Sequence, residues 1–318
     1  MKISALVDIV GGKLLNTPAI SFVTQIHTNI KKVNDGDAFF VNDELHIKKA
    51  IEKGAFCIIV DFIPQINDNE IAWIQVDDIS KAITNVLRYK LINNDIEYFF
   101  IDKILFELLK LFKTKDMSST LLLTGDLIKD FESLHNAENN KKIYSTDIKL
   151  LKNVTPNITT ISYKQYDIQN LTNHSLFETS FSYKNTFFDK LKLPHVYINH
   201  FLQLKEILQD DLEIKKLSNN TLFRPIFINK SNQIVNFGQT NRFILASLDD
   251  EIANIEISYL RAFYNYANIK IIEDKNITDE DLFIQIEDVD YNALFIKGKN
   301  ISYVTQILEQ NDNTDKLF

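Results

Sequence analysis

The chain of 318 residues is 45% hydrophobic and 25% charged, the balance of a folded globular protein, and it is long enough that two or three domains are expected. Its formal net charge of −8, with lysine and arginine dispersed along the chain, argues against a nucleic-acid partner. No apolar run reaches the roughly 20 residues of a membrane span, so we expect no transmembrane segment and a cytoplasmic location.

Residues 23–92 alternate between extended and helical patterns. The segments "VTQIHT", "DAFFV", "AFCIIVD" and "AWIQV" are typical of strands, while "ELHIKKAIEKGA" has helical spacing and reaches Gly54 where a helix would end. Strands separated by helices predict an α/β domain. The one cysteine, Cys57, lies in an apolar strand pattern and is expected to be a buried thiol rather than a nucleophile.

The middle of the chain has a weaker pattern. "YFFIDKILFELLKLF", residues 98–112, has apolar residues at helical spacing, and "SSTLLLTG", "KKIYST" and "TTISY" predict short strands. The polar run "HNAENNKK", residues 135–142, is typical of a surface loop. These patterns predict a second α/β unit, followed by a helical stretch over 191–222 with a polar break at Asp210 and Asp211.

A third α/β unit is predicted from residue 225 onward. Strand patterns in "PIFIN", "QIVNFG", "RFILAS", "IKIIED" and "ALFIKG" alternate with helices over 250–266, after Thr278 and at the end of the chain. The Thr278 hydroxyl is suited to an N-cap because it can accept a hydrogen bond from an otherwise unsatisfied backbone N–H.

The chain lacks a phosphate-binding P-loop. That motif needs Gly-x-x-x-x-Gly-Lys-Ser/Thr, so that glycine amides surround the phosphates and the hydroxyl holds magnesium. At Gly298-Lys299 the leading position is Ala293 and the hydroxyl position is Asn300. The pair Gly12-Lys13 also lacks both the leading glycine and the following hydroxyl.

Residues 34–60 and the following "IAWIQVDDISKAITNVLRYK" resemble the N-terminal domain of the Mur ligases, especially the MurF branch, which adds D-Ala-D-Ala to the peptidoglycan precursor. The resemblance extends to "LKLPHVYINHFLQLKEIL", and to "YNALFIKGKNISYVTQIL", where MurF-type enzymes carry Val-Lys-Gly-Ser before the last helix. It implies a three-domain α/β Mur-ligase-like architecture with a reduced central domain. The domains expected are 1–95, of the UDP-sugar-binding type, 96–222, the reduced central domain, and 223–318, a Rossmann-like ligase domain. The matching positions are Gly36, Asp37, Phe39, His46, Ala50, Gly54, Ala55, Val76, Asp78, Pro194, His195, Asn199, Lys297 and Gly298.

Departures from the family pattern bear on the chemistry. Mur ligases use ATP to form an acyl phosphate, but Asp102-Lys103 stands where the family has Gly-Lys-Thr, among the bulky residues Phe100, Ile101 and Ile104. The segment that carries the family's metal-binding histidine has no counterpart, and the six histidines form no metal-ligand pattern. We therefore expect no catalytic residues, no metal and no cofactor, with ATP and magnesium bound only if the nucleotide site has been remodelled.

The resemblance also implies substrate-binding positions. The family's Asp-Ser-Arg turn, near the substrate's uridine diphosphate, is represented by His27-Thr28-Asn29, and the loss of arginine should weaken UDP-sugar binding. The expected substrate-binding residues are Thr28, Asn29, His46, His195, Asn199, Lys297 and Gly298. Each has a structural alternative: strand termination for Thr28 and Asn29, a structural histidine at His46, helix capping at His195 and Asn199, and a solvated cation at Lys297.

Three hypotheses follow from the sequence. The favoured one is a catalytically disabled MurF-like protein that acts as a binding or regulatory module, with UDP-MurNAc-peptide or a true Mur ligase as partner. The first alternative is an active ATP-dependent amide ligase with a remodelled nucleotide site. The second is a scaffold that retains the fold for a protein partner alone.

Overall fold

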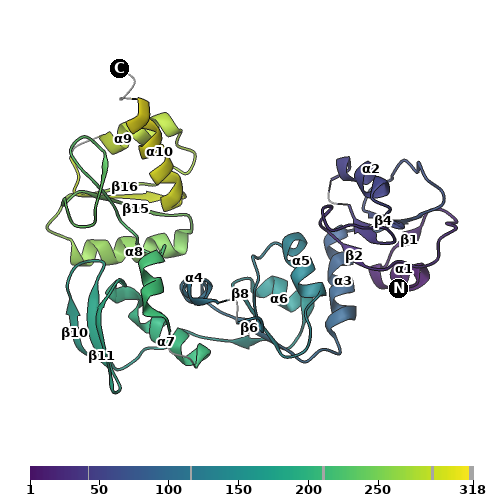
Figure 1. The fold of residues 1–318 in the computed structure, drawn as a ribbon, viewed down its shortest axis with the longest axis horizontal. Helices are drawn as coiled ribbons and strands as arrows, with labels where there is room; N and C mark the ends of the chain where they lie inside the picture. The colour runs from purple at the N-terminus through teal and green to yellow at the C-terminus, as the bar shows by residue number, and fades with distance from the viewer. Residues whose placement is uncertain (42, 115–116, 210–211, 288–289, 315–318) are drawn as a thin grey trace. The chain divides into compact units, whose positions relative to one another are not determined.

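The computed structural model describes residues 1–41, 43–114, 117–209, 212–287 and 290–314. Within it the chain forms two compact units (Figure 1). Unit 1 consists of Met1–Asp102 and Thr114–Ser162, and unit 2 of Lys103–Lys113 and Tyr163–Phe318. The predicted domain borders near residues 95 and 222 remain a prediction.

The first sheet of unit 1 has the strand order β1-β5-β4-β3-β2, and all neighbours are parallel except β1 and β5. Every residue of β4 is buried, as expected for a parallel strand with helices on both faces. Helices α1 and α3 pack on one face and α2 on the other, so two hydrophobic clusters form. The elements are α1 Ile3–Val10, β1 Lys13–Leu14, β2 Ile26–His27, β3 Ala38–Phe40, α2 Leu45–Glu52, β4 Cys57–Val60, β5 Ala72–Gln75 and α3 Ile79–Leu91.

Two predictions for this sheet are confirmed. Helix α2 ends just before Gly54, which has φ +84, a conformation that glycine adopts without the strain a side chain would cause. A Cβ on Gly54 would also lie 2.5 Å from Asp35 Oδ1. Cys57 is fully buried, and burial raises the pKa of its thiol, so it is a core residue.

The second sheet of unit 1 is entirely parallel, in the order β7-β8-β6-β9. Helix α3 packs against both α5 and α6, and Phe131 of α5 contacts Phe40 of the first sheet with ring centroids 6.0 Å apart. The two sheets of unit 1 therefore share one continuous core. The elements are β6 Ile96–Phe100, β7 Thr120–Leu122, α5 Leu127–His135, β8 Lys141–Ser145, α6 Ile148–Val154 and β9 Thr159–Thr160.

Two sequence predictions for the middle segment are wrong in part. Helix α4 covers Lys103–Phe112, but Tyr98 to Phe100 belong to β6, because aromatic residues suit a strand as well as they suit a helix face. The predicted surface loop 135–142 begins with buried His135 at the end of α5 and finishes inside β8.

Unit 2 contains an antiparallel sheet, in the order β10-β11-β12, that the sequence patterns did not indicate. All five residues of β10 are exposed, so this strand lacks the apolar alternation on which strand prediction depends. The predicted helical stretch 191–222 is confirmed in part, and the proposed break at Asp210 and Asp211 lies outside the described residues. The elements are β10 Gln169–Asn173, β11 Thr179–Tyr183, β12 Thr186–Leu191, η1 His195–Tyr197, α7 Ile198–Leu208 and η2 Ile214–Asn219.

The other sheet of unit 2 has the order β14-β13-β15-β17-β16, with β15, β17 and β16 parallel. The third predicted α/β unit is thus confirmed in its elements, including the Thr278 cap, whose hydroxyl accepts from Asp281 N–H at 3.1 Å. Helix α4 packs on α7 and η2 within this unit. The elements are β13 Ile226–Ile228, β14 Ile234–Val235, β15 Phe243–Ser247, α8 Asp250–Phe263, β16 Ile269–Ile272, α9 Asp279–Glu287, β17 Ala293–Lys297 and α10 Ile301–Thr314.

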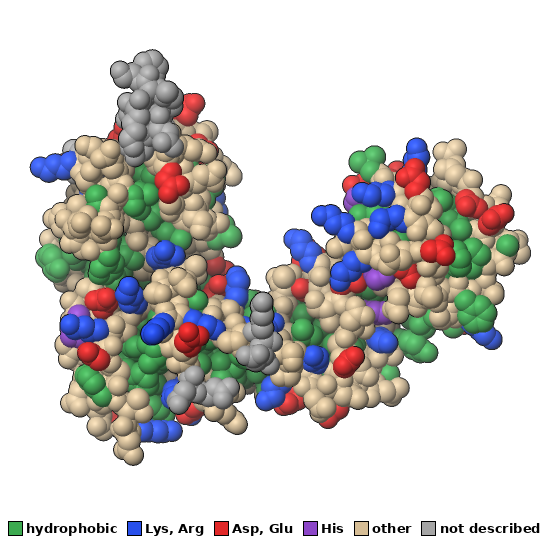
Figure 2. All heavy atoms as spheres, in the orientation of Figure 1, with side chains coloured by type: hydrophobic (Ala, Val, Ile, Leu, Met, Phe, Trp, Pro, Cys, Tyr) green, Lys and Arg blue, Asp and Glu red, His purple; other side chains and the backbone are tan. Residues whose placement is uncertain are grey.

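Two further features concern helix length and the distribution of charge among the described residues. Across these residues, no helix combines the length and the apolar character that crossing a bilayer requires. On the face drawn in Figure 2, basic side chains are interspersed with acidic ones in both units rather than gathered into one band.

Candidate functional site

The carboxyl edge of the parallel sheet in unit 1 is where an α/β protein would bind a phosphate ligand. Strands β7 and β8 end here, and the loops that follow them lead into α5 and α6. The two loops lie close together, since a Cβ on Gly125 would be 4.0 Å from Asp147 Cβ. Gly125 has φ +88, so this loop does contain one turn that favours glycine.

The backbone amides at this edge are already bonded to carboxylates of the chain itself. Asp126 accepts from the N–H groups of Ile128 and Lys129 at 3.1 and 3.3 Å. Asp147 accepts from those of Lys149 and Leu150 at 2.8 and 3.0 Å. Asp130 accepts from Thr124 and Gly125 at 2.9 and 3.0 Å. We call Asp126, Asp130 and Asp147 the acidic edge.

The acidic edge opposes phosphate binding in two ways. Anions bind at helix N-termini through free N–H groups, and here two such amides of each helix are bonded to Asp126 or Asp147. A phosphate would also approach carboxylates of the same charge, and the nearby cation Lys129 is itself paired with Asp126 at 3.1 Å. Burial raises the pKa of Asp130, while the Thr124 and Gly125 amides act in the opposite direction.

The residues at the position of the family's P-loop lysine have other contacts. In unit 2, Lys103 Nζ lies 2.7 Å from Asp249 Oδ2 and 3.4 Å from Glu251 Oε2, and the bond to Asp249 raises the pKa of Lys103. Asp249 in turn caps α8 through the N–H groups of Glu251 and Ile252. Ile101 and Ile104 are buried, as their bulk predicted. The lysine is therefore held in ion pairs at the start of α4.

A cavity of about 440 Å³ lies at the carboxyl edge of the five-stranded sheet in unit 2. Among its lining residues is the buried carboxylate of Glu256, whose Oε1 accepts from Tyr197 Oη at 2.6 Å and from Phe223 N–H at 2.7 Å. Burial raises the pKa of Glu256 to about 8, although both hydrogen bonds lower it. At the start of α10, Asn300 Oδ1 accepts from Tyr303 N–H at 2.7 Å. The other lining residues include Glu107, Lys110, Ser247, Asp249 and Ser302.

The predicted UDP-contacting turn is bonded to helix α5. Thr28 is 3% exposed, its hydroxyl donates to Ile128 O at 2.8 Å, and its N–H donates to Glu132 Oε1 at 3.2 Å. The His27 ring lies between two buried carboxylates: Nδ1 is 3.1 Å from both Glu132 oxygens and Nε2 is 3.4 Å from Asp37 Oδ2. Asn29 is exposed and accepts from Lys31 N–H at 3.0 Å, a local turn contact.

The remaining predicted residues each have their own local surroundings. His46 is half-buried on α2 with Nδ1 buried and unbonded, and His195 contacts the Phe263 ring at 5.5 Å between centroids, where burial lowers its pKa. Asn199 accepts from Tyr166 N–H and donates to Tyr163 Oη, at 3.1 and 2.7 Å.

Lys297 and Gly298 lie where the resemblance places them, at the end of β17. Lys297 Nζ donates to Asn254 Oδ1 at 3.1 Å, and Gly298 has φ +77 with its N–H bonded to Ser247 O. Among the hydrogen bonds and ion pairs of the described residues, none joins two of the seven predicted side chains.

The carboxylates that accept hydrogen bonds at these sites were not predicted from the sequence. Asp126 and Asp147 each precede an apolar helix directly after a strand, which is an N-cap signal that the sequence did offer. Three other acceptors lie within helices, where no local pattern predicts that they bond to groups outside the helix: Asp130, Glu132 and Glu256. In the part of the chain that the structure describes, no cluster of histidine, cysteine and acidic residues could hold a metal ion.

The parallel and mixed sheets define an α/β protein, and comparison with solved structures shows a Mur-ligase-like architecture. The structure is similar to crystal structure I of MurF from Acinetobacter baumannii, with a TM-score of 0.55 and 11% identity over 97% of this chain and 98% of that one. The UDP-N-acetylmuramoylalanyl-D-glutamyl-2,6-diaminopimelate–D-alanyl-D-alanyl ligase from the same organism gives a TM-score of 0.54 and 11% identity, with 97% of each chain covered. No family model matches the sequence, and no curated protein matches it. The likeness establishes the fold, and the predicted fold class is confirmed.

Proposed function

We propose that this chain is a catalytically disabled protein of MurF-like fold that acts as a regulatory binding module in peptidoglycan precursor metabolism, with a functional Mur ligase as its partner. The observation that carries the proposal is that the family's P-loop position, between β6 and α4, holds Asp102 and Lys103 with no glycine, and Lys103 is ion-paired with Asp249 and Glu251. The acidic edge adds that amides in the loops after β7 and β8 are bonded to Asp126, Asp130 and Asp147. Phosphoryl transfer depends on positioned donors and metal ions that offset charge in the transition state. A site with these donors occupied lacks that source of catalysis.

The turn at residue 28 supports a role through a protein partner rather than through a UDP-sugar. The Thr28 hydroxyl and N–H each have a partner within the chain, and Asn29 stands where the family has a cation. A ligand at this turn would have to break buried hydrogen bonds before forming its own. We therefore place UDP-MurNAc-peptide second to the Mur ligase as the expected partner.

Enzyme assays test both parts of the proposal. With ATP, magnesium, UDP-MurNAc-tripeptide and D-Ala-D-Ala, the purified chain should release no phosphate above the buffer rate, whereas an active MurF from the same cells serves as the positive control. Adding the chain to that MurF should change its kcat/KM and produce a co-sedimenting complex.

Two results would contradict the proposal. Phosphate release matched by an equal amount of ligated product would establish an active ligase. An unchanged kcat/KM together with separate sedimentation would remove the regulatory role. Calorimetry with UDP-MurNAc-peptide should give no heat change at millimolar ligand, and a saturable signal would favour UDP-MurNAc-peptide as the partner.

A further inference from the structure

Two adjoining cavities lie in unit 2 beside β14, the edge strand of the five-stranded sheet. The larger, of about 380 Å³, is lined by residues of β13, β14 and the start of α10. The smaller has a volume of about 220 Å³. We call the two cavities together the β14 groove, because Arg224, Pro225 and Phe237 line both of them.

The larger cavity of the β14 groove has apolar walls. Phe227 and Ile301 are buried lining residues, whereas Ile234 is 42% exposed and Phe237 is 55% exposed. The Phe237 ring packs against the Phe227 ring with centroids 5.1 Å apart, so the exposed ring is held beside the cavity. Large apolar side chains that are exposed together along a cavity are typical of an interaction site.

Strand β14 turns backbone groups toward the open edge of the sheet. Asn229 N–H donates to Gln233 O at 3.0 Å, and the next pair along the hairpin is Ile228 with Ile234. Hydrogen-bonded and non-hydrogen-bonded pairs alternate in an antiparallel ladder, so the Ile228–Ile234 pair is of the second kind. The N–H and C=O of Ile234 therefore point away from β13, where an extended chain can bond to both.

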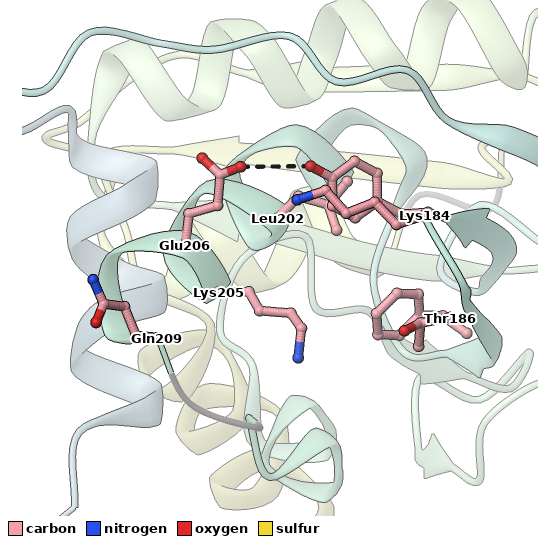
Figure 3. A pocket seen from close by; sticks show the side chains of 8 residues that line it. Lys184, Thr186, Leu202, Lys205, Glu206 and Gln209 are labelled. Atoms are coloured by element: carbon pink, nitrogen blue, oxygen red, sulfur yellow. Dashed lines mark hydrogen bonds between the residues drawn. The ribbon is translucent and has the colours of Figure 1, made fainter.

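The charge of the β14 groove comes mainly from Arg224, which is exposed. Within the part of the chain that the structure describes, no hydrogen bond or ion pair involves its guanidinium. Lys192 and Glu178 line the smaller cavity, so cations exceed carboxylates there. By contrast, Glu206 in the cavity drawn in Figure 3 already accepts hydrogen bonds from three side chains of unit 2. Arg224 is thus available to a carboxylate from outside the chain.

We propose that the β14 groove binds an extended segment of a partner protein in which a large apolar side chain stands next to an aspartate or glutamate. The segment pairs through its backbone with Ile234 and places its apolar side chain in the larger cavity beside Phe237. Its carboxylate pairs with Arg224, since a guanidinium can hold a carboxylate through two parallel hydrogen bonds. A second copy of β14 fits less well, because "NQIVNFG", residues 232–238, contains no carboxylate.

This inference goes beyond the proposed function. The β14 groove includes neither Lys103 and its partners nor the acidic edge, and it includes no residue of the turn at residue 28. A negative result for the groove would leave the assays of ligase activity and of its regulation unaffected.

Selection from a random heptapeptide library displayed on phage, with the whole chain as target, tests the proposal. Enriched peptides should combine a large apolar residue with a neighbouring Asp or Glu. One of them, synthesised and titrated by fluorescence anisotropy, should bind saturably and shift the amide signals of Ile234 and Val235. Arg224→Glu should weaken its binding by about tenfold or more, because like charges then meet. Ile234→Pro should have an effect of similar size, since proline removes the outward N–H at an edge position that tolerates it.

Arg261→Glu and Ile234→Val are the matched controls. Arg261 is an exposed arginine of α8 that does not line the groove, and valine keeps both the N–H and a branched apolar side chain. Both variants should bind the peptide within about twofold of the wild type. If Ile234→Pro fails to fold, the exposed Arg224→Glu decides the matter.

Three results would overturn the proposal. The first is that no peptide is enriched, or that the enriched peptides lack a carboxylate. The second is equal affinity in the Arg224→Glu and Arg261→Glu variants. The third is a dimer of the chain in sedimentation that Ile234→Pro abolishes, since the occupant of the groove would then be a second copy.

Discussion

Replacing Glu132 with alanine is expected to destabilise unit 1 by about 3–5 kcal/mol, the typical cost of removing one partner from a buried charged network. Glu132 is 7% exposed and contacts His27, the Thr28 N–H and, at 3.7 Å, Lys32 Nζ. Without it, the half-buried imidazole of His27 and the buried N–H of Thr28 lose their acceptor. The loss should be smaller in Glu132→Gln, because an amide oxygen can still accept from Thr28.

Urea unfolding followed by circular dichroism measures this effect. Glu138→Ala is the control, since Glu138 is exposed just beyond the same helix and should change stability by less than about 0.5 kcal/mol. Equal stability of the Glu132 and Glu138 variants would show that the bonds between α5 and the turn at residue 28 contribute nothing to folding.

The second large effect is a pH dependence that originates at Glu256. Burial raises the pKa of this carboxyl from 4.5 to about 8, so the folded state holds the proton more tightly than the unfolded state does. The resulting stabilisation is complete below about pH 4.5 and is lost as the pH rises to about 8. This difference in pKa corresponds to a loss of roughly 5 kcal/mol in the free energy of unfolding, since one pKa unit is about 1.4 kcal/mol.

Glu256→Gln isolates this contribution, because the amide oxygen can accept from Tyr197 and Phe223 but has no proton to lose. Relative to the wild type, this variant should gain stability steadily as the pH is raised toward about 8. Glu309→Gln, at an exposed position of α10, should follow the wild type at every pH. Parallel curves for the wild type and Glu256→Gln would contradict the assigned protonation.

Helices and strands were predicted best where apolar residues recur at the spacing of a helix or a strand. Strand β4, helix α2 with Gly54, and the Thr278 cap all follow from local patterns, and the resemblance to Mur ligases supplied the architecture. Strand β10 escaped prediction because its five residues are exposed and owe their conformation to pairing with β11. Tyr98 to Phe100 were assigned to a helix because a short aromatic run fits either period.

For the candidate site, the sequence predicted which family motifs are absent but not which contacts are present. The absence of glycines at residues 100–104 predicts that this segment forms no P-loop, but it does not predict that Lys103 pairs with Asp249 and Glu251. The contact between His27 and Glu132 joins residues 105 positions apart, and no local pattern encodes such a pair. Asp130 likewise lies in α5, and its carboxylate accepts hydrogen bonds from the N–H groups of Thr124 and Gly125 in the loop before that helix.

Thermal unfolding with and without millimolar Mg-ATP tests most directly the proposal that neither residues 100–104 nor the acidic edge binds a triphosphate. Any ligand that binds the native state must stabilise it, by about 2.7 kcal/mol at a hundredfold excess over its Kd. We predict that the melting temperature is the same with Mg-ATP as with magnesium alone. A saturable rise in melting temperature with Mg-ATP would show that the triphosphate binds, and would contradict the loss of the nucleotide site.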